Sequence, residues 1–131
     1  MQRHTGHCAC GAIGYSALGE AINPHYCHCD TCRRCAGAPV VAWVNFAAEG
    51  FAWRDEEPAW FASSSVMRRG FCPHCGSSLC TVEDDGYVCV TVASLDHPER
   101  IAPGYHIYVQ HALPWLKLED GLRREVREDR F

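Results

Sequence analysis

The chain has 131 residues, of which 47% are hydrophobic, and a formal net charge of −4. This length and composition are typical of one globular domain, so we treat residues 1–131 as a single domain. Asp and Glu outnumber Lys and Arg by 16 to 12, which argues against nucleic acid as the main partner, and no apolar run approaches the ~18 residues of a membrane span.

Ten cysteines are the most unusual feature of the composition. The segment from Met1 to His7 has no apolar run of the kind found in a secretory signal peptide, so we expect a cytoplasmic location. Thiols stay reduced in that compartment, and clustered cysteines there are typical of metal sites. A disulfide scaffold is the alternative that this reasoning disfavours.

The first predicted element is an extended segment with a pair of thiols. Cys8 and Cys10 are two residues apart, so in an extended chain both side chains point to the same face. Gly11 follows directly and permits the tight turn that a metal-binding knuckle needs. Residues 12–18 then predict a strand.

The next elements surround a second group of thiols. Residues 25–29 are expected to be extended, because Pro24 disfavours a helix that runs into them. Asp30 is expected to cap a short turn over residues 31–34. Residues 39–48 are rich in β-branched and aromatic side chains with apolar residues on both faces, which predicts a central strand.

Short strands continue through the second half of the chain. Asp85-Gly86 predicts a hairpin turn between strands at 78–82 and 87–92. The tail, residues 117–131, alternates charge sign and predicts a solvated short helix or a fraying end. No long helical period is present, so the predicted fold class is all-β, with many short strands between glycine and proline turns. The remaining predicted strands are residues 51–53, 59–62, 66–71 and 105–109.

Cys72 and Cys75 form a zinc knuckle by their spacing, with Gly76 after the second thiol. One knuckle supplies two ligands, and Cys8 and Cys10 would complete a closed, structural four-thiolate site. Structural zinc contributes about 10–16 kcal/mol of apparent binding free energy. A whole domain has only about 5–15 kcal/mol of net stability. Loss of this site is therefore expected to unfold the protein.

Cys27, Cys29 and Cys32 form a second group, with three thiols in six residues. Three protein ligands and one exchangeable position are the pattern of a catalytic zinc site. The alternative is a second structural site that Cys35 or a neighbouring histidine closes. Cys80 and Cys89 lie within apolar strands and are expected to be buried.

The order of these motifs resembles the glutathione-dependent formaldehyde-activating enzyme family, which also includes centromere protein V. Later segments that look like the C-terminal half of that family are Leu95-Asp96, His106-Ile107-Tyr108-Val109 and Pro114-Trp115. The motifs that carry the resemblance are Gly6-His7-Cys8-Ala9-Cys10-Gly11, Cys27-His28-Cys29-Asp30-Thr31-Cys32-Arg33-Arg34 and Phe71-Cys72-Pro73-His74-Cys75-Gly76-Ser77.

The resemblance implies a β-tent fold with two zinc ions per chain, one structural and one catalytic. The activity of the family is the condensation of formaldehyde with glutathione to S-hydroxymethylglutathione, which is a carbon–sulfur lyase reaction in the reverse sense. The ligands implied are Cys8, Cys10, Cys72 and Cys75 for the structural ion, and Cys27, Cys29 and Cys32 for the catalytic ion. The chain departs from the family pattern at Cys35, a thiol that the family usually lacks at this point.

Glutathione or another small thiol is the expected partner, and Arg33 and Arg34 are candidates to bind its carboxylates beside the metal. A rival interpretation is a non-catalytic, zinc-stabilised β module that binds a small thiol ligand or a protein partner. A third is thiol redox chemistry between Cys32 and Cys35. Exposed strand edges are compatible with a homodimer.

Overall fold

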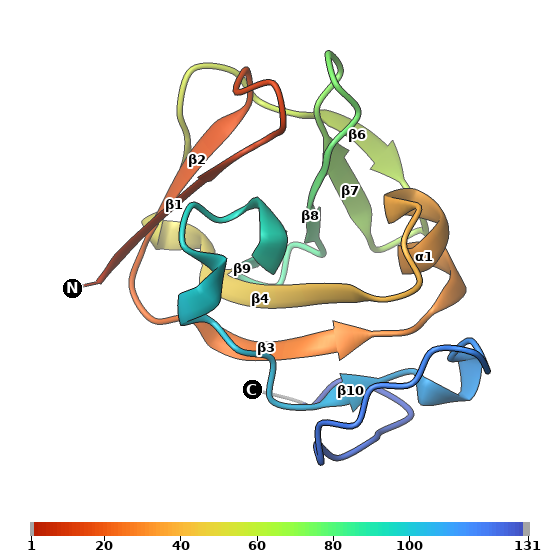
Figure 1. Cartoon of the computed structure of the whole chain (residues 1–131). Coiled ribbons are helices and arrows are strands. Elements are labelled where there is room, and N and C mark those ends of the chain that lie inside the picture. Colours follow the sequence, from red (N-terminus) through yellow and green to blue (C-terminus); the bar gives the residue numbers. More distant parts are fainter. Residues whose placement is uncertain (1, 130–131) are drawn as a thin grey trace.

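The computed structural model describes residues 2–129, which form two β-sheets and one helix (Figure 1). The smaller sheet has the strand order β1-β2-β5, and the larger has the order β10-β3-β4-β9-β8-β7-β6. The all-β prediction is therefore confirmed. The smaller sheet consists of β1 (Arg3–His7), β2 (Gly14–Leu18) and β5 (Phe51–Trp53). The larger sheet consists of β3 (Ile22–Cys27), β4 (Val41–Ala47), β6 (Ala59–Ala62), β7 (Arg68–Phe71), β8 (Ser78–Val82), β9 (Tyr87–Thr91) and β10 (His106–Ile107).

The helix, α1 (Asp30–Ala36), lies at the same end of the molecule as β6 and β7 (Figure 1). Short 3₁₀ turns cover other connections, and none of the helices within residues 2–129 is long and apolar enough to cross a membrane. These turns are η1 (Ala48–Gly50), η2 (Val92–Ser94), η3 (Pro98–Arg100) and η4 (Val109–His111).

Strand β4 pairs with β3 on one side and β9 on the other, which agrees with the central strand predicted at residues 39–48. The predicted hairpin is also present, since β8 and β9 are antiparallel and Gly86 has a φ of +91° in the connecting turn. The other pairs in the larger sheet are antiparallel except β10 with β3, which is parallel.

The turn predicted over residues 31–34 is instead part of α1, and its N-cap is Cys29 rather than Asp30. The sulfur of Cys29 accepts a hydrogen bond from the backbone N–H of Cys32 at 3.3 Å, so a thiol takes the place of the expected carboxylate cap. Gly37 ends the helix in the left-handed conformation.

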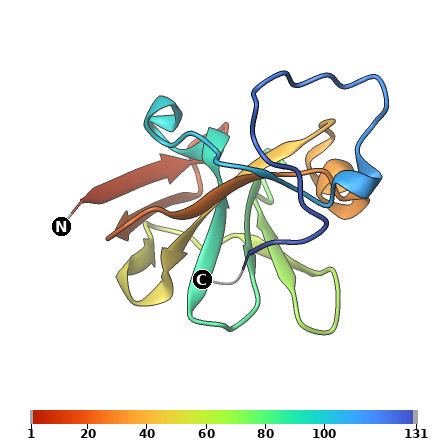
Figure 2. The same ribbon diagram turned by 90° about the horizontal axis from the view of Figure 1, so that it is seen from below.

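The tail prediction was wrong up to residue 129, because the described residues form neither a helix nor a free end. Figure 2 shows the tail returning beside β10. There the backbone N–H of His106 donates to the backbone carbonyl of Arg123, and the backbone N–H of Glu125 donates to the backbone carbonyl of His106. Glu128 also accepts a hydrogen bond from Asn23 at 3.1 Å. The open edge of β10 offers backbone partners to the tail, and a charge pattern does not reveal such bonds. Residues 130–131, also included in that prediction, lie outside the described residues.

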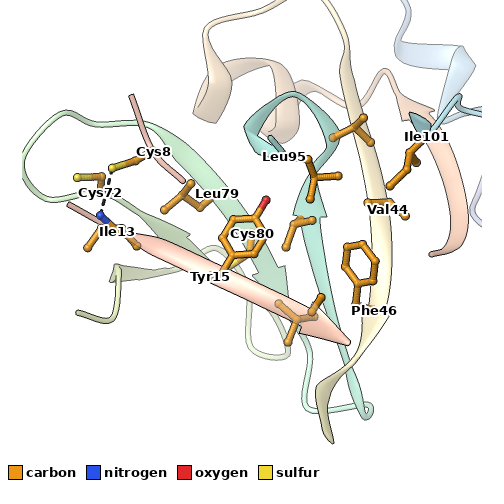
Figure 3. Close-up of a cluster of buried hydrophobic side chains, with 14 residues drawn as sticks. Cys8, Ile13, Tyr15, Val44, Phe46, Cys72, Leu79, Cys80, Leu95 and Ile101 are labelled. Carbon is orange, nitrogen blue, oxygen red and sulfur yellow. Dashed lines mark hydrogen bonds between the residues drawn. The ribbon is translucent and has the colours of Figure 1, made fainter. Parts of the chain in front are cut away.

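The main hydrophobic core lies between the two sheets, and Figure 3 shows Tyr15 facing Cys80 across it. Cys80 is buried there, as its apolar strand context predicted, whereas Cys89 is only partly buried and packs against a second cluster around Trp43. Cys8 and Cys72 lie at one edge of the main core (Figure 3). The first thiol group is thus anchored directly to the packed interior.

Candidate metal centres

The first thiol cluster joins two turns that are far apart in the sequence. Cys8 and Cys10 come from the β1–β2 turn, and Cys72 and Cys75 come from the β7–β8 turn. The four sulfurs lie within 4.8 Å of one another, with 3.6 Å between Cys8 and Cys10 and 3.8 Å between Cys10 and Cys72. A tetrahedron with Zn–S bonds of about 2.3 Å has edges of about 3.8 Å. This cluster therefore fits one tetrahedral zinc ion.

The two turns present their thiols in a similar way. In each pair the first thiol is buried (inner) and the second is exposed (outer). Gly11 and Gly76 each follow the outer thiol, with φ of +82° and +81°. Their N–H groups donate to the carbonyls of Cys8 and Cys72 at 3.0 and 2.8 Å. The inner sulfurs also accept backbone N–H bonds, from Ile13 to Cys8 at 3.3 Å and from residues 74 and 75 to Cys72 at 3.3 and 3.4 Å. Such donors stabilise thiolate charge.

The second cluster is built by the end of β3 and the start of α1. Cys27, Cys29 and Cys32 place their sulfurs within 4.8 Å of one another. Cys27 and Cys32 are buried and Cys29 is half-buried. Cys35, one turn later on α1, is exposed, and within residues 2–129 it is not part of this cluster. The structure thus brings together the three thiols of the expected open site and leaves Cys35 outside.

The three thiols of the second cluster lie close enough to shift one another's pKa. Hydrogen bonds with Cys27 and then Cys32 lower the pKa of the Cys29 thiol to about 2. The same contact with Cys29, together with Cys32 and burial, raises the pKa of Cys27. Thiolates this close together repel one another, so all three thiols lose their protons only when a cation balances the charge. A metal ion that binds thiolates would supply that positive charge. All ten cysteines are free of disulfides, so every one of these thiols is available.

Two histidines between the ligands turn away from the thiols. The Nε2 atom of His28 lies 2.8 Å from Nδ1 of His106, and Nε2 of His74 lies 3.0 Å from a carboxylate oxygen of Glu56. His111 is exposed. No histidine within residues 2–129 joins either thiol cluster.

Arg69 is the residue at this site that sequence reasoning missed. Both of its terminal nitrogens approach the sulfur of Cys32, Nη1 at 3.7 Å and Nη2 at 3.8 Å. Its neighbour Arg68 points the other way, pairs with Asp84 at 3.1 Å and lies over the ring of Trp60. Alternation along β7 separates the two arginines, but only the pairing of β7 with β6 and β8 fixes which of them is buried.

The two arginines predicted to bind substrate, Arg33 and Arg34, lie outside the walls of the cavities beside the second cluster. Arg33 is half-buried, and its Nε donates to the carbonyl of His28 at 3.4 Å. Arg34 is exposed. Among the described residues, neither Arg33 nor Arg34 lines the two cavities that open beside Cys32.

The two cavities share Cys32, Trp43 and Arg69 in their walls. One has a volume of about 340 Å³ and extends between α1 and the β6–β7 hairpin, where Phe61 and Phe71 line it. The other has a volume of about 260 Å³ and is lined by all three cysteines of the second cluster. A small molecule in either cavity would therefore lie next to Cys32.

The fold and site define a small all-β protein with two cysteine clusters that could bind metal ions, one closed by four thiols and one with three. Residues 3–111 match the glutathione-dependent formaldehyde-activating enzyme family, and the chain belongs to this family. The resemblance noted in the sequence motifs is thereby confirmed.

One relative is an uncharacterized lyase of Schizosaccharomyces pombe, which is 34% identical over 79 residues. The matched segment covers 60% of this chain and 57% of that protein, so the chain spans little more than half the length of this relative. A Rhodobacter sphaeroides protein of known crystal structure shares the fold. The TM-score is 0.57 at 17% identity, over 92% of this chain and 98% of that chain.

Proposed function

We propose that the protein is a zinc-dependent carbon–sulfur lyase of the S-hydroxymethylglutathione synthase type. It would join glutathione, or another small thiol, to formaldehyde or a related small aldehyde in the cytoplasm. The observation that carries this proposal is the second cluster, where three thiols converge beside a cavity and Cys35 lies outside. The family and the lyase name of the yeast relative support the same class of reaction.

We propose two zinc ions per chain, held by the residues that the structure brings together. Cys8, Cys10, Cys72 and Cys75 would hold the structural ion, whose place at the edge of the main core supports a role in stability. Cys27, Cys29 and Cys32 would hold the other ion. When bound, that ion would supply a Lewis acid for the aldehyde oxygen or favour the thiolate form of the substrate.

The reaction forms one bond, between the thiol sulfur and the aldehyde carbon, while the aldehyde oxygen gains the proton that the thiol loses. A free thiol has a pKa of about 8.5, so roughly 3% is ionised at pH 7. Full ionisation would therefore accelerate the reaction by at most about 30-fold. Any larger effect must come from holding the two reactants together, which is the role of the cavity walls.

For glutathione itself, we propose that Arg33 and Arg34 bind the substrate carboxylates from the side of α1. Both follow Cys32 directly in the helix, and the guanidinium group suits a carboxylate. An Arg34→Ala variant is expected to bind glutathione more weakly, as measured by calorimetry. An unchanged binding constant would remove Arg34 from this role.

The decisive experiment measures exchange between formaldehyde and S-hydroxymethylglutathione by NMR. The reaction proceeds without an enzyme, so the rate must be compared with a protein-free sample and with Cys32→Ser. We expect an increase with zinc-loaded wild-type protein that Cys32→Ser abolishes, while Cys35→Ser serves as the matched control and retains it. No increase, in protein shown to hold two zinc ions, would contradict the proposed activity.

The second candidate is a binding module without turnover. The absence of acceleration combined with measurable thiol binding would favour it.

Redox chemistry between Cys32 and Cys35 makes a different prediction, because mild oxidation would then release one zinc ion reversibly. Loss of zinc that reductant restores would support redox chemistry over both other functions.

A further inference from the structure

We propose that Arg69 is the substrate-binding cation beside the second cluster, and that the adjoining cavity accepts a compact molecule with an apolar body and one carboxylate. This inference rests on the proposed function only in taking the second cluster as the reactive site. Within the proposed reaction it favours the alternative of a small thiol other than glutathione, because it predicts a ligand smaller and less polar than a tripeptide.

The sheet holds Arg69 inside the molecule. It is on β7, opposite Phe61 on β6 and Thr81 on β8, and its exposed fraction is only 9%. Arg68, one residue earlier, faces outward, because successive side chains of a strand point to opposite faces. A buried arginine loses its hydration, so such residues are rare unless something compensates the charge.

The contacts of Arg69 account for only part of its hydrogen-bonding capacity. Its Nη atoms approach the sulfur of Cys32, and Nη2 also approaches the thioether sulfur of Met67 at 3.7 Å. The Nε–H is buried and has no hydrogen-bond partner. A guanidinium has five N–H donors, and a thioether is a weak acceptor. An oxygen ligand would give the Nη groups a stronger acceptor than the two sulfur atoms do.

The positive charge of Arg69 balances thiolate charge at Cys32, which explains part of its placement. A guanidinium stays charged in proteins, and the Nη atoms of Arg69 approach the sulfur of Cys32. This interaction uses the terminal nitrogens alone. It gives no reason for a buried Nε–H without a partner, or for the position of Arg69 in the walls of both cavities.

The walls of the larger cavity define the rest of the ligand. Trp43, Phe61 and Phe71 line it together with Arg69, in a volume of about 340 Å³. Pockets for small molecules range from about 300 to 1,000 Å³, so this cavity is among the small ones. Apolar walls penalise any polar group that they cannot pair. One carboxylate can pair with Arg69, whereas the second carboxylate and the ammonium of glutathione would have no such partner there.

The test compares benzoate with benzamide, two probes of nearly equal shape of which only benzoate is charged. Binding to zinc-loaded protein is measured by calorimetry and needs no turnover. Hydrogen bonds to charged groups are worth about 1.5–3 kcal/mol, so we expect benzoate to bind wild-type protein at least about tenfold more tightly than benzamide. Arg69→Gln is expected to abolish that preference, and the matched variant Arg68→Gln is expected to retain it.

Equal affinity of the two probes for wild-type protein would overturn the proposal. So would a benzoate preference that persists in Arg69→Gln, because the charge would then be recognised elsewhere, for example at the metal. If Arg69→Gln loses zinc, Arg69→Lys replaces it, and we expect at least a threefold smaller preference, since lysine lacks the planar fork. An unchanged preference in that variant would also overturn the proposal.

A measurement on the unmutated protein avoids any effect of substitution on folding. The ¹⁵N-edited NMR signal of the Arg69 Nε–H, assigned by its absence in Arg69→Lys, is expected to shift with benzoate and not with benzamide. No shift at saturating benzoate would contradict the proposal. Because these readouts report binding, they separate failure of this inference from failure of the lyase activity.

Discussion

His28 and His106 are 78 positions apart in the sequence, yet Nε2 of His28 lies 2.8 Å from Nδ1 of His106. His106 is in turn held by Asp120, whose Oδ2 is 2.8 Å from its Nε2. The other carboxylate oxygen of Asp120 accepts from Arg124 at 2.8 Å. Because His28 stands between Cys27 and Cys29, this chain of contacts ties the second thiol cluster to the C-terminal tail.

Substitution of His106 should loosen the second metal site. A His106→Phe variant keeps a ring of similar size but leaves the buried Nε2 of His28 without its partner. An unsatisfied buried polar group costs about 1–3 kcal/mol. We expect a lower melting temperature and faster transfer of one of two zinc ions to a colorimetric chelator. His111→Phe, at an exposed position, is the matched control and should release zinc at the wild-type rate. Equal release rates in both variants would contradict the link.

The carboxyl group of Asp120 should titrate at unusually low pH. Its hydrogen bond with His106, then those with Leu122 N–H and Arg124, lower its pKa in the folded protein. A lowered folded pKa means that ionised Asp120 stabilises the fold above the unfolded value of about 3.9, and that this contribution is lost as the pH falls through the folded pKa.

Carboxyl ¹³C NMR can follow this titration in zinc-loaded protein. We expect the Asp120 signal to stay in its ionised position at pH 4, and to titrate at higher pH in His106→Phe than in wild type. A midpoint for Asp120 unaffected by His106→Phe would show that this hydrogen bond is not the cause.

Zinc content should separate the open second site from a closed one. We expect Cys35→Ser to keep two zinc ions per chain, because its thiol lies outside the three-sulfur cluster, whereas Cys32→Ser should hold one ion much more weakly. Cys72→Ser, in the four-thiol cluster, should lower the free energy of unfolding most. Mass spectrometry under native conditions counts the ions. Loss of one ion from Cys35→Ser would mean that Cys35 closes the second site.

Local spacing made the thiol clusters predictable. Cys8 with Cys10, and Cys72 with Cys75, each sit within a single turn, so the geometry of half a site is set within a few residues. The central strand at β4 was predictable for a similar reason, because its apolar residues occupy both faces of a short segment.

Other features depend on pairing between distant segments. The tail bonds to β10 through backbone groups, which no side-chain pattern records. The direction of Arg69 depends on the phase of β7 against β8, and that pairing has an irregularity between Gly70 and Phe71. The sequence Arg68-Arg69 alone therefore does not show which of the two arginines is buried, because that depends on how β7 pairs with its neighbouring strands.

The left-handed glycine of the zinc knuckle gives a final test of the first site. Gly76 has a φ of +81°, and a Cβ added there would meet no atom within 4 Å, so a substitution acts through backbone strain alone. An L-residue in this region costs about 1–2 kcal/mol, and asparagine tolerates it better than alanine. We expect Gly76→Ala to lower the free energy of unfolding in urea by about 1–2 kcal/mol and Gly76→Asn to lower it less. Gly104→Ala, at a site without positive φ and with its nearest neighbour at 3.7 Å, is the control and should change little. If alanine and asparagine at position 76 were equally harmless, the knuckle would not depend on this conformation.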